Sequence, residues 1–119
     1  MNTNDKSKID SLVEDRKRAH VFLNRNSKVY RSFLDLESAT YIDGSLEKKQ
    51  KLLIGTAISV IKNCESCMEW HVGEALRCGA TQDEILEAIE VAYKMGGGPA
   101  VVSSRFAVKV LEYYSEETN

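Results

Sequence analysis

The chain has little proline, little cysteine and no long hydrophobic run, and each shortage excludes a class of protein. A single proline, Pro99, leaves most segments free of helix breakers. Three cysteines are too few, and odd in number, for a secreted disulfide scaffold. No apolar run approaches the roughly 20 residues of a membrane span, and the polar N-terminus lacks the apolar segment of a signal peptide. We therefore expect a cytoplasmic protein.

The charge balance gives no reason to expect a polyanionic partner. The formal net charge is -2, so neither nucleic acid nor an anionic membrane is expected to bind. The segment 14–20, EDRKRAH, is interpreted as a solvated helix face because acidic residues adjoin its basic ones. At 119 residues the chain suits one hydrophobic core, and we expect a single domain over residues 1–119.

Hydrophobic spacing predicts helices along the chain and no convincing strand. The expected helices cover residues 7–23, 27–42, 45–61, 64–78, 81–95 and 100–114. Ser45 and Asn63 are the expected N-caps of the third and fourth helices, and Thr81 with Glu84 forms a capping box. Gly79 is expected to end the fourth helix in a left-handed conformation. The third helix is so apolar that we place it at the centre of an all-α bundle of about six helices.

Two of the three cysteines and one of the two histidines fall within residues 63–71, NCESCMEWH. On a helix, Cys67 and His71 lie one turn apart on the same face, and Cys64 joins them at the first turn. A helix N-terminus and a neighbouring imidazole both lower the pKa of a thiol. The two-residue gap also allows a disulfide with little backbone movement. The segment therefore predicts a thiol oxidoreductase site.

Two other interpretations of these residues stay open. Cys64, Cys67 and His71 can supply three zinc ligands, but Cys78 would lie roughly 20 Å from Cys64 along one helix, too far to be the fourth. A three-ligand site would need a further ligand from elsewhere or from another subunit, so we rank metal below redox chemistry. Alternatively, the cysteines are small core residues, which is the interpretation we prefer for Cys78.

The segment NCESCMEWHVGEALRCGATQDEILEAIEVAYKMGGGPAVV resembles the carboxymuconolactone decarboxylase-like superfamily, specifically its alkylhydroperoxidase D-like (AhpD-like) branch. The resemblance extends from about Phe33 to Tyr114. It rests on the pattern Cys-x-x-Cys-x-x-x-His, the Gly-Ala-Thr link and the glycine cluster that follows the next helix. It implies an all-helical fold whose subunits assemble through helix-mediated interfaces, as a homotrimer or homohexamer.

The resemblance also implies a peroxidase activity of the peroxiredoxin-like kind, with no bound cofactor. By this resemblance, Cys67 is the thiolate that attacks a hydroperoxide. Cys64 donates a proton and then resolves the resulting sulfenic acid to a disulfide, and His71 belongs to the proton relay. A dithiol donor, lipoyl-type or thioredoxin-like, would then reduce that disulfide. The same dithiol could reduce a disulfide substrate instead of a hydroperoxide.

The chain departs from the family pattern at two positions. Leu52 stands where the family often has a glutamate of the relay, and a leucine cannot relay a proton. Ser66 stands where the peroxidase prototype has a second histidine. Glu37 is a candidate substitute base, but we favour a position at the edge, with its carboxylate in water, because burying an unpaired glutamate is expensive. Glu65 and Glu69 are interpreted as solvated.

Two other functions are weighed against the redox one. A lactone decarboxylase would use His71 as base and Arg77 or Arg105 to bind a carboxylate, with no need for a cysteine pair. A non-catalytic assembly protein would keep both sulfurs out of reach of thiol reagents. Measuring thiol reactivity against pH would separate these functions best. Met68 and Trp70 either line a pocket or pack between subunits.

Overall fold

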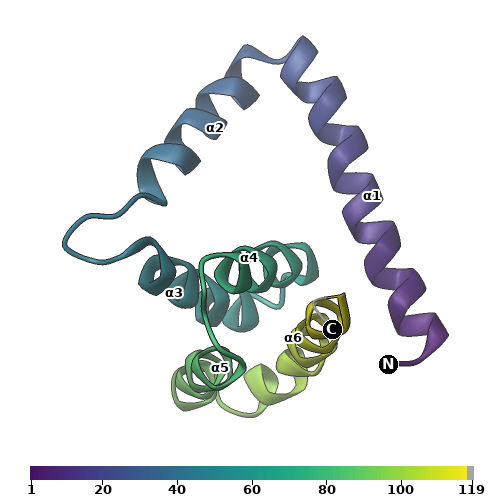
Figure 1. Ribbon diagram of the computed structural model, residues 1–119, viewed down its shortest axis with the longest axis vertical. Helices are drawn as coiled ribbons and strands as arrows, with labels where there is room; N and C mark the ends of the chain where they lie inside the picture. Colours follow the sequence, from purple (N-terminus) through teal and green to yellow (C-terminus); the bar gives the residue numbers. More distant parts are fainter. Residues whose placement is uncertain (118–119) are drawn as a thin grey trace.

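The computed structural model describes residues 1–117, and within them it contains six α-helices and no strand (Figure 1). The helices are α1 (Thr3–Asn26), α2 (Lys28–Thr40), α3 (Lys48–Ile61), α4 (Glu65–Arg77), α5 (Gln82–Gly96) and α6 (Gly98–Glu117). The prediction of an all-α fold of about six helices is confirmed.

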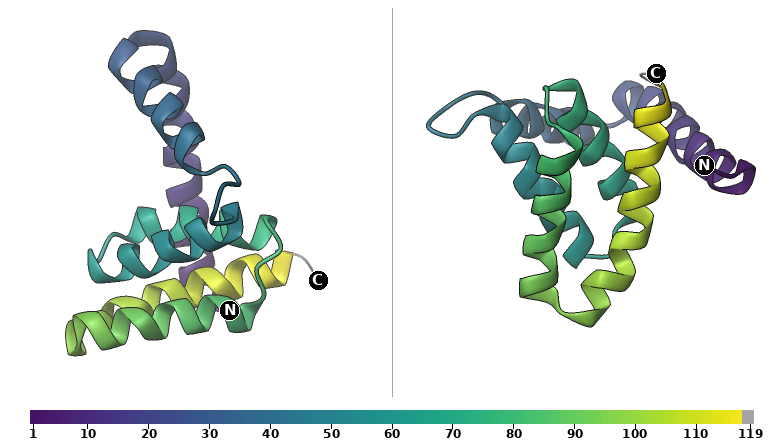
Figure 2. Two further views of the ribbon diagram at one scale, coloured as in Figure 1. Left: turned by 90° about the vertical axis from the view of Figure 1, so that its left-hand side faces the viewer. Right: turned by 60° about the horizontal axis from the view of Figure 1, so that its bottom comes forward.

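The helices form two parts, a body made of α3 to α6 and an arm made of α1 and α2. In the body α3 and α4 lie over α5 and α6, and Figure 2 shows the arm extending away from these two layers. The first half of α1 packs on α4 and α6, whereas the backbone of α2 approaches, among the described helices, only that of α1. The arm is therefore anchored to the body mainly through α1.

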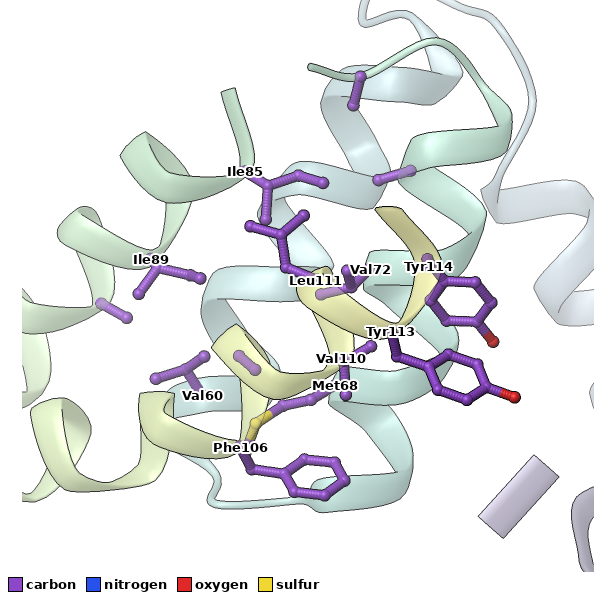
Figure 3. Close-up of a cluster of buried hydrophobic side chains, with 14 of the residues drawn as sticks. Val60, Met68, Val72, Ile85, Ile89, Phe106, Val110, Leu111, Tyr113 and Tyr114 are labelled. Atoms are coloured by element: carbon purple, nitrogen blue, oxygen red, sulfur yellow. The ribbon is translucent and has the colours of Figure 1, made fainter. Parts of the chain in front are cut away.

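The hydrophobic core lies between the four helices of the body (Figure 3). Its fully buried side chains include Val60 of α3, Met68 and Val72 of α4, Ile85 of α5 and Val110 of α6. The buried residues of α5 are Ile85, Ile89 and Ala92, which recur at helical spacing on one face. Since α4 packs against α3 and α6, its N-terminal turn with the cysteine motif is held by the core.

Two of the predicted N-caps are wrong. Ser45 does not cap α3; Glu47 does, in a reciprocal capping box with Gln50 whose side chain accepts from the Glu47 amide at 2.8 Å. Asn63 does not cap α4 either, because its φ of 52° places it in the left-handed region, and Cys64 is the N-cap. The change at Asn63 moves Cys64 from the first turn to the position just before it.

Other local predictions are confirmed. The Thr81 amide donates to the Glu84 carboxylate at 2.9 Å, and the Glu84 amide donates to the Thr81 hydroxyl at 3.1 Å. Gly79 has a φ of 90° after the end of α4, as a left-handed helix stop requires. Gly97, with a φ of 69°, separates α5 from α6. These short-range signals correctly predicted the end of α4 and both ends of α5.

The first and last helices are longer than predicted. The α1 helix begins at Thr3 because the Asn2 side chain accepts from the Asp5 amide at 2.8 Å and so provides a cap four residues earlier than expected. The α6 helix starts at Gly98, with Pro99 in its first turn. Val101 and Val102, near the start of this helix, are exposed.

Apolar side chains are also exposed on two surfaces. The arm face consists of Val29, Phe33 and Leu36 on α2, and the α3–α5 face consists of Ile54, Ile58, Ile61, Val91 and Met95. The prediction that α3 is central holds for its contacts with α4, α5 and α6, but Ile58 is 50% exposed, so one side of the helix faces outward. No helix among the described residues has the length and apolarity to cross a membrane.

Candidate active site

The cysteine pair lies at the N-terminus of α4. Cys64 and Cys67 are joined by a disulfide, with their Cα atoms 5.2 Å apart. The Cys67 amide donates to Cys64 Sγ at 3.2 Å, so the sulfur takes the place of the oxygen of an ordinary N-cap. Both sulfurs therefore lie at the positive end of the α4 dipole, where a thiolate is favoured after reduction.

Cys67 opens onto a cavity of about 880 Å³ between α4 and the arm. The α4 wall contains Ser66, Cys67, Trp70 and His71. The opposite wall is contributed by α1 and α2 and is largely apolar. A cavity of this size holds an organic molecule, because small-molecule sites typically measure about 300–1,000 Å³. Among the described residues, Cys67 lines this cavity and Cys64 does not.

The hydrogen bonds of His71 determine its tautomer. Its Nδ1 lies 2.8 Å from the Cys67 carbonyl oxygen, which can only accept, and 3.3 Å from Ser59 Oγ. The Ser59 hydroxyl already donates to the Gly55 carbonyl oxygen at 2.6 Å. The proton is therefore on Nδ1, and Nε2 is the acceptor for the Tyr41 hydroxyl, 2.7 Å away.

Burial favours the neutral form of both rings in this pair. Desolvation lowers the pKa of His71, although its bond to the Cys67 backbone and the charge of Glu74 oppose the shift. Desolvation, with a smaller effect of Glu37, raises the pKa of Tyr41. At neutral pH the site therefore contains a neutral imidazole that accepts a hydrogen bond from a phenol.

A glycine makes room for the pair. A Cβ at Gly55 of α3 would lie 2.6 Å from His71 Nε2 and 2.9 Å from the Tyr41 hydroxyl, so a larger side chain would displace both rings. The His71 ring also meets Trp70 edge-on, with ring centroids 4.9 Å apart. The orientation of the imidazole is thus fixed from α3, α4 and the end of α2.

The structure brings the three predicted site residues together but connects them differently. Cys64, Cys67 and His71 share the first two turns of α4 and its N-cap, as predicted. The hydrogen bonds of the imidazole, however, go to Tyr41, Ser59 and the Cys67 carbonyl, and within the described residues none goes to a sulfur. The expected direct support of a thiolate by His71 is therefore not seen in the disulfide form.

Glu37, which was expected in water, and His20, whose expected exposure is confirmed, both line the cavity. Glu37 lies on its α2 wall and is half-buried, and desolvation, with the charge of Glu74, raises the pKa of its carboxyl. His20 lies on its α1 wall, and its Nδ1 is 2.7 Å from the Tyr30 hydroxyl. The position of Glu37 has one cause: α1 and α2 form the cavity wall across from α4, and no local sequence pattern predicts that.

The interpretation of Glu69 as solvated is wrong. Glu69 is 2% exposed, and its carboxylate binds Arg16 of α1 and the Tyr114 hydroxyl of α6. Burial and this carboxylate raise the pKa of Tyr114 to about 12, so the phenol remains a donor. Arg16 is consequently not part of a freely solvated face. Glu65 does remain at the surface, where it pairs with Lys8.

The residues needed for the competing functions lie elsewhere. Arg77 pairs with Glu74 and Arg105 is exposed, and neither lines the cavity beside Cys67. Cys78 is a free, half-buried thiol packed against the core, as preferred from the sequence.

Met68 is buried in that core, whereas Trp70 lines the cavity. Within residues 1–117 no group of three or more histidine, cysteine or acidic side chains could hold a metal ion.

Sequence interpretation missed Tyr41 and Gly55 as parts of the site. Tyr41 was assigned to the apolar side of the second helix, and nothing in its neighbourhood indicates a histidine partner thirty residues later. Gly55 did carry a signal, because a glycine inside a helix costs about 1 kcal/mol relative to alanine and commonly marks a close approach.

Comparison with known proteins places the chain in a family. Residues 27–110 match the model of the carboxymuconolactone decarboxylase family. An uncharacterized protein of the cox locus of Paracoccus denitrificans is 41% identical over 81 residues, which cover 68% of this chain and 73% of that protein.

Two solved structures of the same family have the same fold. A family protein from Legionella pneumophila superposes with a TM-score of 0.80 at 31% identity, covering 94% of this chain and 98% of the other. One from Thermotoga maritima, for which a role in the antioxidative response has been suggested, gives 0.82 at 31% identity, with 91% and 92% covered. The chain therefore belongs to the carboxymuconolactone decarboxylase family, and its dithiol motif is consistent with the AhpD-like branch.

Proposed function

We propose that this protein is a thiol-dependent oxidoreductase that reduces organic hydroperoxides, or disulfides, with Cys67 as the attacking thiolate. One observation carries the proposal: a cysteine pair at a helix N-terminus, of which Cys67 opens onto a cavity large enough for an organic substrate. The antioxidative role suggested for the relative from Thermotoga maritima agrees with this assignment.

The proposed cycle uses both sulfurs. The Cys67 thiolate attacks the terminal oxygen of a hydroperoxide, so that an S–O bond forms, the O–O bond breaks and the alkoxide leaves as an alcohol after protonation. The Cys64 thiol then displaces water from the sulfenic acid and closes the disulfide. A dithiol donor of the lipoyl or thioredoxin type takes the disulfide back to two thiols and is itself oxidised to a disulfide. Such a cycle suits a reducing compartment, and we propose the cytoplasm.

Removing one sulfur at a time tests this cycle. With a dihydrolipoyl donor and an aryl hydroperoxide, Cys67→Ser should lower turnover by about 10³-fold or more, because the nucleophile is lost. In the absence of donor, reduced Cys64→Ser should consume about one hydroperoxide per chain and remain a sulfenic acid instead of closing a disulfide, because it has no resolving thiol. The matched control, Cys78→Ser, removes the third thiol and should retain turnover.

Two results would reject the assignment. One is equal hydroperoxide turnover by wild type and Cys67→Ser. The other is a disulfide that no dithiol donor reduces in the folded protein, which would indicate a non-catalytic member of the family. Decarboxylation of a carboxylated lactone at a rate unchanged by removing Cys64 and Cys67 would favour the decarboxylase function instead.

We also propose that the protein works as a homo-oligomer, a trimer or hexamer. The arm face and the α3–α5 face both expose apolar side chains that a second copy would cover, such as Phe33 at 56% and Met95 at 73% exposure. Light scattering measures the mass directly. Phe33→Glu and Val91→Glu should each lower it, whereas a monomeric wild type at micromolar concentration would contradict the proposal.

A further inference from the structure

Tyr41 lies at the joint between the arm and the body, and its backbone is fixed there. It is the C-cap of α2, and its amide donates to the Glu37 carbonyl oxygen at 3.0 Å. Lys51 of α3 donates to the carbonyl oxygens on both sides of it, at Thr40 (3.0 Å) and Ile42 (2.9 Å). An ammonium that binds two carbonyls holds this short segment against α3.

The side chain of Tyr41 is held as firmly as its backbone. Its hydroxyl donates to His71 Nε2 at 2.7 Å, and its ring lies 5.6 Å from that of Trp70, centroid to centroid. Gly55 provides the space in which the phenol and imidazole meet. Tyr41 also lines the cavity together with Cys67 and His71. The phenol is therefore placed on the wall where the dithiol meets its substrate.

The bonding of His71 leaves one ring nitrogen able to take up a proton. Nδ1 already carries a proton and donates it to the Cys67 carbonyl, so only Nε2 can take another. The hydroxyl of Tyr41 occupies the acceptor position of Nε2. Leu52, at the position where a carboxylate would extend the relay, is fully buried in the core. The Tyr41 hydroxyl is therefore bonded to the one ring nitrogen that can take up a proton, and Tyr41 lines the same cavity as Cys67.

We propose that Tyr41 is a catalytic residue that relays a proton between Cys67 and His71; this inference rests on the proposed thiol chemistry. In the forward step the Cys67 thiol gives its proton to the Tyr41 oxygen while the Tyr41 proton moves to His71 Nε2, which leaves a thiolate, a neutral phenol and an imidazolium. After the S–O bond forms and the O–O bond breaks, the alkoxide takes the phenol proton, and His71 returns its own to Tyr41.

Charged groups from four helices face this relay. Glu74 of α4 favours the imidazolium through its charge, Glu37 of α2 favours the neutral phenol, and Lys51 of α3 binds the carbonyl oxygens beside Tyr41. On the α1 wall the cavity is lined by Arg16, Lys17 and His20. Glu37 is the competing candidate for the proton acceptor, because it lines the same cavity.

The test measures the alkylation rate of Cys67 against pH in the reduced Cys78→Ser background, with mass spectrometry to identify the alkylated sulfur. Tyr41→Phe should raise the midpoint of this profile by about one pH unit, because the thiolate loses the stabilisation that the phenol and its imidazolium partner provide. It should also lower kcat for hydroperoxide reduction by about 10²-fold, with KM nearly unchanged. Lys51→Met keeps the phenol but removes the two hydrogen bonds that hold the backbone on both sides of Tyr41, and it should lower kcat by about tenfold.

The matched control is Tyr93→Phe, which removes a phenol that is bonded to Ser104 and lies outside the cavity lining, and it should leave both measurements close to wild type. Lys49→Met is the control for Lys51. The alkylation profile needs no peroxide, so it tests Tyr41 even if the wild type turns over no hydroperoxide, a result that would reject only the proposed function. An alkylation midpoint that Tyr41→Phe leaves unchanged, or one that Glu37→Gln shifts in its place, would overturn the inference.

Discussion

Two histidine–tyrosine pairs line one cavity, and they differ in how they are held. Tyr41 and His71 belong to the body side, where the second ring nitrogen donates to the Cys67 carbonyl and Gly55 leaves room for both rings. His20 and Tyr30 belong to the arm, and their 2.7 Å contact joins α1 to α2. The first pair is surrounded by packed elements, and the second is largely open to solvent.

The difference matters because proton transfer requires fixed geometry, which comes from the groups that support the reacting ones. The pair on the body is supported from α3, α4 and the end of α2, whereas among the described helices the backbone of α2 itself packs only on α1. Identical side-chain chemistry is thus expected to give a proton relay in one place and a surface contact in the other. The following predictions separate the two pairs experimentally.

The largest effect is expected at Glu69, which ties the arm to the body. Glu69→Ala leaves the Arg16 guanidinium and the buried Tyr114 hydroxyl without their acceptor, and it should lower the free energy of unfolding by roughly 2–4 kcal/mol. The measurement is urea unfolding followed by circular dichroism. Glu65→Ala is the control on the same helix, and because it removes only a surface pair with Lys8 it should cost less than about 1 kcal/mol. Equal losses would show that the buried carboxylate does not fasten the arm.

A smaller effect is expected at Gly55, and it should break the body pair alone. Gly55→Ala places a Cβ 2.9 Å from the Tyr41 hydroxyl, so the rings must move, at a cost of roughly 1–3 kcal/mol. Emission from Trp70, the only tryptophan, should shift because its ring stacks edge-on with His71. Gly98→Ala is the control, since a Cβ there meets no atom within 4 Å. Unchanged emission and stability in Gly55→Ala would mean that the pair is not tightly enclosed.

Local signals in the sequence predicted the frame of this fold well. The Thr81 and Glu84 capping box and the left-handed Gly79 each depend on residues within one turn, so a short window contains all the physics needed. The cysteine motif was equally local, and it placed Cys64, Cys67 and His71 on one helix end correctly. The cap at Asn63 failed because Cys64, a residue rarely considered as a cap, occupies that position with its sulfur.

The surroundings of the site could not be predicted in this way. Glu69 looks like a solvent-exposed helix residue until Arg16, fifty-three positions earlier, and Tyr114 are known to lie beside it. Likewise, His20 and Glu37 line the cavity only because the arm forms the wall across from α4. A buried carboxylate destabilises the fold unless it is paired and hydrogen-bonded. Partners on distant helices produce no periodic pattern in a single sequence, so they cannot be predicted from it.

The smallest effect is a pH dependence that should involve the body pair alone. Burial lowers the folded-state pKa of His71 below its usual 6.5, so the unfolded chain binds the proton more readily. The stability that neutral His71 contributes is therefore complete above about pH 6.5 and is lost as pH falls towards the folded pKa. Glu37 acts in the opposite sense, because its raised pKa favours the folded state at acid pH.

Comparing urea midpoints at about pH 7.5 and 5.5 in wild type and His71→Gln cancels that contribution. His71→Gln should lose less stability than wild type on acidification. The control His20→Asn keeps His71 and should lose as much stability as wild type. Equal losses in wild type and both variants would mean that His71 is not desolvated in solution.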